Sequence, residues 1–239
     1  MFAPVTDISP TIGKSNELIN ALYSMPTSSH RLVMLALSQI RYSGDDMADL
    51  DYYVTVSAQQ WMDTFTSTPG SVYDQIRQGA EYLQHTTSAT IRLPSDTRKS
   101  GYRRVQWFSQ VEYQQDLGFI ELWFGKQIRP FISQLSRDFT IIDLQALRDV
   151  RRSHSIRLYE LLRQYRSTGW RHDSLLELKD LFGVAEKYPR WVDFRKRVLD
   201  SAVSELNDKT SMAIKYEVIK KGRAVSAIKF RFTDKLTSV

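Results

Sequence analysis

The apolar residues of this chain recur at helical spacing, most clearly in WVDFRKRVLDSAVSELN, residues 191–207. One side of this stretch is apolar at intervals of three and four residues, through Trp191, Phe194, Val198, Ala202 and Leu206. The other side is polar and consists of Arg190, Asp193, Lys196, Arg197, Asp200, Ser204 and Asn207. Arg195 is the exception, because an ideal helix places it near the middle of the apolar side. The pattern predicts a half-buried helix with a cationic, hydrogen-bonding outer face.

The order of predicted elements occurs twice along the chain. Each copy begins with an amphipathic helix that carries Ser-His near its start, at Ser29-His30 and again at Ser153-His154. A short strand follows, YYVTVS or GWRHDS, and its last serine caps the next helix. A third helix and a β-hairpin complete each copy, with turns at QDLG in the first and KKGRAV in the second.

Matching segments support a duplication. Besides the Ser-His helices, three pairs match in the same order: SAQQWMDTF (57–65) and SLLELKDLF (174–182), TSATIRL (87–93) and TSMAIKY (210–216), FIELWF (119–124) and AIKFRF (227–232). Short matches arise by chance, but four in one order indicate an internal duplication.

The repeated order of elements is that of a winged helix, whose third helix enters the major groove in helix-turn-helix proteins. We therefore predict an α+β fold made of tandem duplicated winged-helix domains. The expected division is a flexible N-terminal tail at 1–14, an N-terminal winged-helix domain at 15–135 and a C-terminal winged-helix domain at 136–235.

The 239 residues carry a net charge of +6 that is unevenly distributed. Through residue 130 there are 11 Lys and Arg against 13 Asp and Glu, a net of −2, and from residue 131 onward 22 against 14, a net of +8. A basic surface is often only solvated, so the charge alone does not decide for nucleic acid. A cationic third helix followed by a basic wing favours double-stranded DNA as the partner.

In the C-terminal copy, the helix is expected to read base edges and the wing to hold the phosphate backbone. The helix contacts that we predict are Arg190, Asp193, Arg195, Lys196, Arg197, Asp200 and Ser204. The wing contacts are Lys220, Lys221 and Arg223. For Arg195, we expect a place in the first turns to carry the side chain past the core toward DNA.

In the N-terminal copy, the third helix is SVYDQIRQGAEYLQ, residues 71–84. Its expected core residues are Val72, Ile76, Ala80 and Leu83, which leave Ser71, Asp74, Gln75 and Gln78 on a nearly neutral outer face. The DNA contacts predicted for this copy are Ser71, Gln75, Arg77 and Gln78, with Arg103 and Arg104 on its hairpin. The alternative is that this domain mainly binds protein, because its hairpin is rich in aromatic and β-branched residues and ends the sheet at an edge.

Catalytic and metal sites find little support in the sequence. The chain has no cysteine, which excludes disulfides and thiolate sites. GKS at 13–15 lacks the first glycine of a phosphate-binding loop, because that position is Ile8. The histidines include no closely spaced pair, and GDDMADLD (44–51) lacks calcium-loop spacing and is expected to be a solvated loop. We therefore expect a protein that is not an enzyme and has no cofactor and no metal.

The sequence shows no sign of export or of membrane insertion. MFAPVTDISPTIGKS contains no signal-peptide pattern. No window approaches the roughly 18 apolar residues that a membrane helix needs. We expect a cytoplasmic protein with no membrane partner.

Two stretches, 15–40 and 187–230, resemble the replication initiators of iteron-containing plasmids. The specific part is the succession DFRKRVL, AVSELN, KKGR and IKF. The resemblance implies two winged-helix domains that bind directly repeated origin sequences, the iterons, as a monomer. It also implies a homodimer, paired through the N-terminal domain, that binds an inverted operator repeat and represses the protein's own promoter. A host initiator, helicase and chaperones are further partners that the family implies.

A dimeric winged-helix transcriptional regulator without an initiator role remains the alternative. A dimeric repressor obtains its two DNA-binding heads from symmetry and needs only one in each chain. Two winged helices of unequal charge in one chain therefore favour the initiator. The N-terminal copy differs from the family pattern because its third helix is less basic. How this copy contacts DNA is therefore left open.

Overall fold

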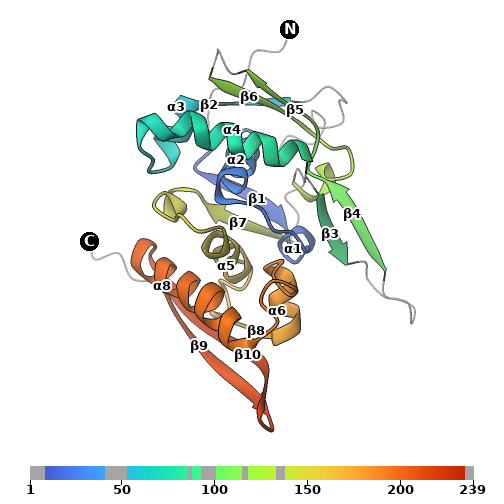
Figure 1. The fold of residues 1–239 in the computed structure, drawn as a ribbon, viewed down its shortest axis with the longest axis vertical. Helices are drawn as coiled ribbons and strands as arrows, with labels where there is room; N and C mark the ends of the chain where they lie inside the picture. The colour runs from blue at the N-terminus through green and yellow to red at the C-terminus, as the bar shows by residue number, and fades with distance from the viewer. Residues whose placement is uncertain are drawn as a thin grey trace. The chain divides into compact units, whose positions relative to one another are not determined.

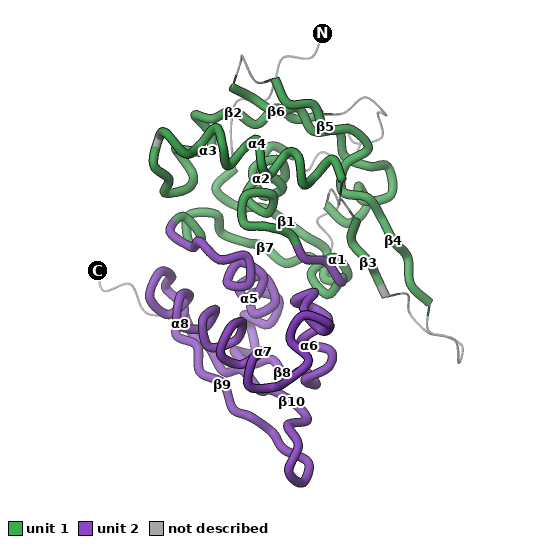
Figure 2. The backbone as a smooth tube through the Cα atoms, in the orientation of Figure 1, with its two compact units in different colours: residues 1–21, 25–148 green, residues 22–24, 149–239 purple. Residues whose placement is uncertain are grey.

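The computed structural model describes residues 9–40, 53–85, 88–92, 101–114, 118–132 and 138–234. The chain divides into two compact units: unit 1 comprises residues 1–21 and 25–148, and unit 2 comprises residues 22–24 and 149–239 (Figure 2). No helix among the described residues is long and apolar enough to span a membrane. The acidic segment 44–51 lies outside the described residues.

Both units combine helices with small antiparallel sheets (Figure 1). Unit 1 contains β1 (Thr11–Ser15), α1 (Asn16–Ile19), α2 (Thr27–Ser38), β2 (Tyr53–Ser57), α3 (Ala58–Thr64), α4 (Pro69–His85), β3 (Ser88–Arg92), β4 (Tyr102–Gln106), β5 (Phe108–Gln114), β6 (Phe119–Phe124), η3 (Arg129–Phe131), β7 (Phe139–Asp143) and η4 (Gln145–Leu147). Unit 2 contains α5 (Ser153–Arg163), β8 (Trp170–Ser174), α6 (Leu175–Leu181), α7 (Trp191–Phe194), η5 (Arg195–Leu199), α8 (Asp200–Lys209), β9 (Met212–Lys221) and β10 (Ala224–Asp234).

The main sheets of the two units have the same topology. In unit 1 the strand order is β2-β6-β5, and in unit 2 it is β8-β10-β9, with every neighbouring pair antiparallel. In each unit a helix precedes the first strand and two helical segments separate it from the closing hairpin. Both units therefore have the predicted winged-helix order, with β6 and β10 as the central strands.

Serine caps set the start of the second helix in each unit. The Ser57 hydroxyl accepts a hydrogen bond from the Gln60 N–H (3.2 Å), and the Gln60 side chain accepts one from the Ser57 N–H (2.9 Å). This reciprocal pair is a capping box. Ser174 accepts from the Glu177 N–H at 3.1 Å in unit 2. Both predicted caps are confirmed. In each unit the capping serine is the last residue of a strand, and the helix begins at the next residue.

The apolar stripes of the two third helices face their own cores. In α4 the predicted core residues are all buried: Val72, Ile76, Ala80 and Leu83. In the helix that runs through α7, η5 and α8, Phe194, Val198, Ala202 and Leu206 are fully buried. Trp191 is only half-buried, because it occupies the first helical position, beyond the packed part of the helix. The outer face of each third helix is left exposed, as its polar pattern predicts.

The hairpin of unit 1 differs from the prediction. β4 pairs with β3 in a separate two-stranded sheet, and only β5 pairs with β6. Arg103 and Arg104 therefore lie on a β3–β4 ribbon and not on the wing of the main sheet. The match of segment 87–93 with 210–216 is wrong for the same reason, because β5 occupies the place that β9 occupies in unit 2.

A buried tryptophan separates β4 from β5, so these two strands do not continue as one strand of the main sheet. Trp107, between β4 and β5, has no exposed surface. Its carbonyl accepts the Gly125 N–H at 3.0 Å, and the Lys14 Nζ lies 5.3 Å from its ring centre. Burying this ring turns the chain from one sheet to the other. The β3–β4 ribbon has no counterpart among the described residues of unit 2.

The unit boundaries also differ from the expected division. β1 pairs along its whole length with β7, so residues 11–14 form a strand and not a flexible tail. Because β7 follows residue 136, this pairing also keeps residues 138–148 in unit 1 and moves the boundary to 148. Periodicity does not reveal such a boundary, since two five-residue strands that are far apart in sequence define it.

Residues 22–24 belong to unit 2, although they come from the N-terminal part of the chain. The Tyr23 hydroxyl donates to Glu160 Oε2 (2.8 Å), and Arg157 Nη1 donates to Tyr23 Oη (2.9 Å). All three side chains are buried, and burial raises the pKa of Tyr23 well above its usual value, so the hydroxyl stays protonated. Gly183, at φ 64°, admits this segment, since a Cβ there would lie 2.6 Å from the Ser24 Cβ.

Replacing Tyr23 with phenylalanine is expected to lower the free energy of unfolding of the full chain by about 1.5 kcal/mol. The ring remains, but the buried Glu160 carboxylate loses a hydrogen-bond donor. Urea unfolding measures the change, with Tyr102→Phe as the control, because Tyr102 is 60% exposed. Equal stability of the two variants would show that the buried hydroxyl is not needed. A C-terminal fragment that begins after residue 24 would lack this side chain altogether.

Candidate nucleic-acid interface

The outer face of the third helix in unit 2 carries most of the residues predicted to read DNA. Arg190, Arg195, Lys196, Arg197 and Ser204 are exposed, and Asp193 and Asp200 are half-buried. Asn207 is also half-buried but faces the sheet, where its side chain hydrogen-bonds to both the N–H and the C=O of Ile214. Phe194, Val198 and Leu206 anchor the opposite side. The helix therefore presents a row of cations with two carboxylates among them.

The first carboxylate, Asp193, is held between two arginines. Arg190 Nε donates to Asp193 Oδ2 at 2.6 Å. The pKa of Asp193 is lowered, first by this hydrogen bond, and the charge of Arg197 contributes as well. All three side chains lie at the surface, so the pair adds little to stability. The ion pair orders the side chain of Arg190. Arg197, on the next turn of the helix, remains available as a cation.

The second carboxylate, Asp200, links the helix to the wing strand β9. Arg195 Nε lies 3.3 Å from Asp200 Oδ2, and the Tyr216 hydroxyl donates to Asp200 Oδ1. The pKa of Arg195 is raised, first by hydrogen bonding to Tyr216, and the negative charge of Asp200 contributes as well. The sequence did not identify Tyr216, because its position on a strand shows no link to a helix 16 residues earlier.

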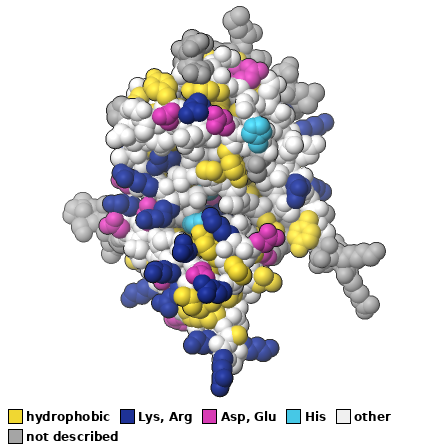
Figure 3. Space-filling view, in the orientation of Figure 1, with side chains coloured by type: hydrophobic (Ala, Val, Ile, Leu, Met, Phe, Trp, Pro, Cys, Tyr) yellow, Lys and Arg dark blue, Asp and Glu magenta, His cyan; other side chains and the backbone are white. Residues whose placement is uncertain are grey.

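The wing of unit 2 ends in a short basic turn. Lys220, Lys221 and Arg223 are all exposed around Gly222, whose φ of 64° suits a tight hairpin turn. Figure 3 shows Lys and Arg side chains gathered at the end of the β9–β10 hairpin. Extended cations of this kind suit phosphate contacts that do not depend on sequence.

Val192 is an exposed residue of the third helix that the sequence interpretation left out. It lies in the first turn of α7 and is 68% exposed. Arg195 and Lys196 follow it by three and four residues, so the three share one helix face. Its apolar side chain is suited to contact a thymine methyl group. The signal was present in the sequence, since Val192 falls outside the apolar stripe.

The corresponding face in unit 1 is closer to neutral. Arg77 is the one cation of helix α4, and it pairs with Asp74 (3.3 Å) and Glu81 (3.1 Å). Ser71 and Gln75 are half-buried and bonded to each other at 2.8 Å, and Gln78 is exposed. This helix therefore offers hydrogen-bonding groups with a largely compensated charge.

The β3–β4 ribbon carries two further arginines of unit 1 that were predicted to contact DNA. Arg103 and Arg104 are exposed, and Tyr102 beside them is 60% exposed. Arg104 is paired with Thr90 and Arg103 with Ile91 across the ribbon. Both lie on β4, in a different sheet from the wing of the main sheet, so unit 1 does not reproduce the helix-and-wing surface of unit 2.

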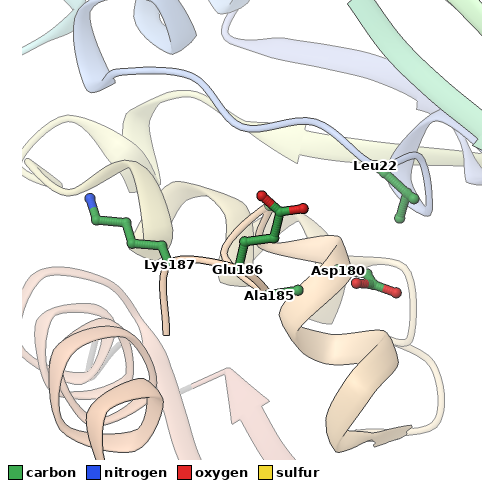
Figure 4. Close-up of a pocket in the computed structure, with 6 residues that line it drawn as sticks. Leu22, Asp180, Ala185, Glu186 and Lys187 are labelled. Carbon is green, nitrogen blue, oxygen red and sulfur yellow. The ribbon is translucent and has the colours of Figure 1, made fainter. Parts of the chain in front are cut away.

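A pocket of about 570 Å³ lies within unit 2 and is lined by Leu22, Asp180, Gly183, Ala185, Glu186 and Lys187. Figure 4 shows Asp180, Ala185 and Glu186 along its lower side and Leu22 above them. The lining combines two carboxylates with one ammonium group. The described lining residues include no histidine and no hydroxyl nucleophile, the groups that a nucleophile and base arrangement uses.

Two family models together match most of the chain. Residues 11–163 match the model described as "Initiator Replication protein, WH1", and residues 174–232 match "Initiator Rep protein, WH2". The chain belongs to this family of replication initiators. Its two winged-helix domains are the predicted fold, and its members are DNA-binding initiators rather than known enzymes. The first model ends after α5, one helix later than the boundary of unit 1.

Similar proteins span nearly the whole chain. The PI protein of Escherichia coli is 24% identical over 250 residues, covering 91% of this chain and 80% of its own length. An uncharacterized 27.6 kDa protein of Escherichia coli is 25% identical over 225 residues, covering 91% and 93%. A crystal structure of the Pi initiator protein in complex with iteron DNA superposes with a TM-score of 0.77 at 23% identity, covering 97% of this chain and all of that one. This structure supports the fold of both domains.

Proposed function

We propose that this protein initiates replication of a plasmid by binding directly repeated origin sequences as a monomer. The main support is the outer surface of unit 2, where a cationic helix and a basic wing lie on one winged helix in a chain of the initiator family. The similar Pi initiator was crystallised with iteron DNA, which is the class of site that we propose here. Binding several repeats bends and opens the origin, and host initiator and helicase proteins are recruited to it.

The proposal assigns base reading to the third helix and backbone grip to the wing. Arg190, Arg195, Lys196 and Arg197 reach base edges with Asp193, Asp200 and Ser204, while Lys220, Lys221 and Arg223 neutralise phosphates. Unit 1 makes auxiliary contacts through Ser71, Gln75, Arg77 and Gln78, and through the ribbon residues Arg103 and Arg104. The nearly neutral face of α4 makes this contribution smaller than that of unit 2.

The same proposal includes a second assembly, in which a dimer paired through unit 1 binds an inverted repeat at the protein's own promoter and represses it. Strand β5 ends the sheet of unit 1, and edge strands pair readily with another chain. Chaperones that dissociate the dimer would supply the monomer for initiation. The protein acts inside the cell, where the plasmid is.

A transformation experiment tests the initiator role. The gene with its flanking repeats, on a plasmid that lacks any other origin, is expected to be maintained under selection, and a frameshift in the gene is expected to abolish maintenance. Footprinting the flanking DNA then locates the direct and inverted repeats. Specific footprints without plasmid maintenance would favour the alternative, a dimeric winged-helix regulator without an initiator role.

A further inference from the structure

Arg195 lies on the outer surface although an ideal helix would place it over the core. Its side chain is 54% exposed. Arg195 begins η5, a π-helical segment in which the Asp200 N–H bonds to the Arg195 carbonyl, five residues back. This turn holds one residue more than an α-helical turn, so the register of the helix changes from Arg195 onward. Inserted turns of this kind frequently occur at functional sites.

Arg195 has an ordered partner in Asp200, at the other end of the inserted turn. Asp200, the first residue of α8, lies 3.3 Å from Arg195 Nε. Tyr216, on wing strand β9, donates to the same Asp200 carboxylate that pairs with Arg195. Tyr216 is itself half-buried against Phe230, with ring centres 6.2 Å apart, so its hydroxyl has a fixed place. The guanidinium is thus held by Asp200, whose carboxylate is fixed in turn by Tyr216 on the wing strand.

We propose that Asp200 and Tyr216 are positioning residues that orient Arg195 for a bidentate contact with O6 and N7 of one guanine in each repeat. The inference rests on the proposed function, because it requires sequence-specific binding to a repeat. Arginine donating to O6 and N7 is the commonest specific contact between a side chain and a base. Because Asp200 pairs with Nε, the two terminal nitrogens of the fork are the atoms that the proposal assigns to the base.

The physical gain is preorganisation. A free arginine side chain loses rotamer entropy when it is fixed, so a side chain ordered before binding loses less on contact. The arrangement also links the helix that contacts bases to the wing that contacts phosphates, because Tyr216 belongs to the strand that leads to Lys220 and Lys221. The inference therefore predicts that removing one hydroxyl on the wing strand weakens recognition at a single base pair.

Binding of the full chain to a repeat in which guanines are replaced one at a time by 7-deazaguanine tests the contact. The replacement removes the N7 acceptor and keeps base pairing. At one guanine, the wild-type protein is expected to bind on the order of tenfold more weakly. Arg195→Ala should weaken binding to the unmodified repeat and show no further loss at that guanine. A wild-type loss that persists unchanged in Arg195→Ala at every guanine would overturn the contact.

Tyr216→Phe and Asp200→Asn test the positioning role. Each is expected to reduce the 7-deazaguanine effect at the Arg195 guanine to about threefold or less, while the effects at other guanines stay as in the wild type. Tyr165→Phe, a hydroxyl removal elsewhere in unit 2, should leave the whole pattern unchanged. If Tyr216→Phe and Asp200→Asn instead weaken binding to all repeats uniformly, Asp200 and Tyr216 have only a structural role.

The same measurements separate failure of this inference from failure of the proposed function. A chain that binds its flanking repeats no better than random DNA contradicts the proposed function itself. Specific binding that shows no guanine coupled to Arg195 leaves the initiator intact and removes only the inference.

Discussion

Replacing Arg197 or Lys196 with alanine is expected to weaken binding to the cognate repeat by about 1–3 kcal/mol for at least one of the two, and much less on random DNA. Both side chains are exposed on the turn that follows the first turn of the helix. The N-terminal part of a recognition helix is the part that contacts base edges in helix-turn-helix proteins. Fluorescence anisotropy on a labelled repeat and on a scrambled duplex of the same length measures both affinities.

A wing variant provides the contrast. Lys221→Ala is expected to weaken binding to both duplexes nearly alike, because a phosphate contact carries no sequence information. It should also reduce the slope of log K against log salt by about 0.9, the value for one lost phosphate contact. The helix and the wing are thus distinguished by specificity as well as by affinity.

Lys209→Ala is a matched control on the same helix. Lys209 lies in the last turn of α8, is about half exposed and pairs with Asp208 at 2.9 Å. It lies far along the helix from Lys196 and Arg197, so its loss should change neither affinity. Equal losses on both duplexes for Lys196→Ala, Arg197→Ala and Lys221→Ala would mean that the helix does not read the sequence.

The parts of the fold that the sequence predicts well are those in which local chemistry and burial agree. Ser57 and Ser174 each end a short strand with a side chain that caps the next helix, and both caps form. The apolar stripe of α4 predicts which side of the helix packs on the core, because the spacing of apolar residues within the helix alone separates the buried face from the exposed face. These signals repeat in both copies, which is why the winged-helix order could be predicted.

The parts that were predicted wrongly depend on distant residues. β3 and β4 each have five residues, and nothing local shows that they pair with each other rather than with the main sheet. The place where the chain changes sheets is fixed by burial of Trp107, and residues 11–14 become a strand only through β7. Short strands of this kind have no periodicity long enough to identify a partner.

The candidate interface shows the same division between local and distant signals. The exposure of the cations on the helix and the wing could be predicted from their spacing and position in the sequence. Their contacts with DNA stay predictions. Arg195 could not be placed correctly by an ideal helix, because the inserted turn of η5 changes the register after Phe194. Tyr216 joins the cluster only through a contact between helix and sheet. Residues that position others are therefore the ones that a periodic pattern misses.

The surface proposed for dimerisation lies on the sheet of unit 1. β5 ends this sheet, and Gln110, Trp123 and Tyr53 lie side by side across its outer face. Trp123 stacks on Tyr53 at 4.8 Å, and Tyr53 is 37% exposed. A charge at Val111 is a poor probe of this surface, because Val111 pairs with the fully buried Leu122 and shares its face.

Gln110→Glu is a better probe of the proposed dimer. Gln110 is exposed and donates to Glu112, and Glu112 is paired with Glu121 on the same face. The pKa of Glu121 is already raised, first by burial and then by the charge of Glu112. A third carboxylate would face its own copies across a two-fold axis, so the repulsion is larger in the dimer than in the monomer.

The wild-type protein is expected to shift from monomer to dimer with concentration and on the inverted repeat, whereas Gln110→Glu stays monomeric at the same concentrations. The variant should bind the inverted repeat on the order of tenfold more weakly and the direct repeat at least as well. Gln59→Glu is the matched control, since Gln59 is exposed in α3 and also donates to a carboxylate, Asp63, at 2.8 Å. Sedimentation with binding to both repeats measures the shift. Two outcomes would contradict pairing through this edge: Gln110→Glu loses affinity for both the direct and the inverted repeat, or the wild-type protein stays monomeric on the inverted repeat. A dimer joined through β5 makes binding of the inverted repeat depend on that strand, whereas unit 2 can bind DNA in either assembly.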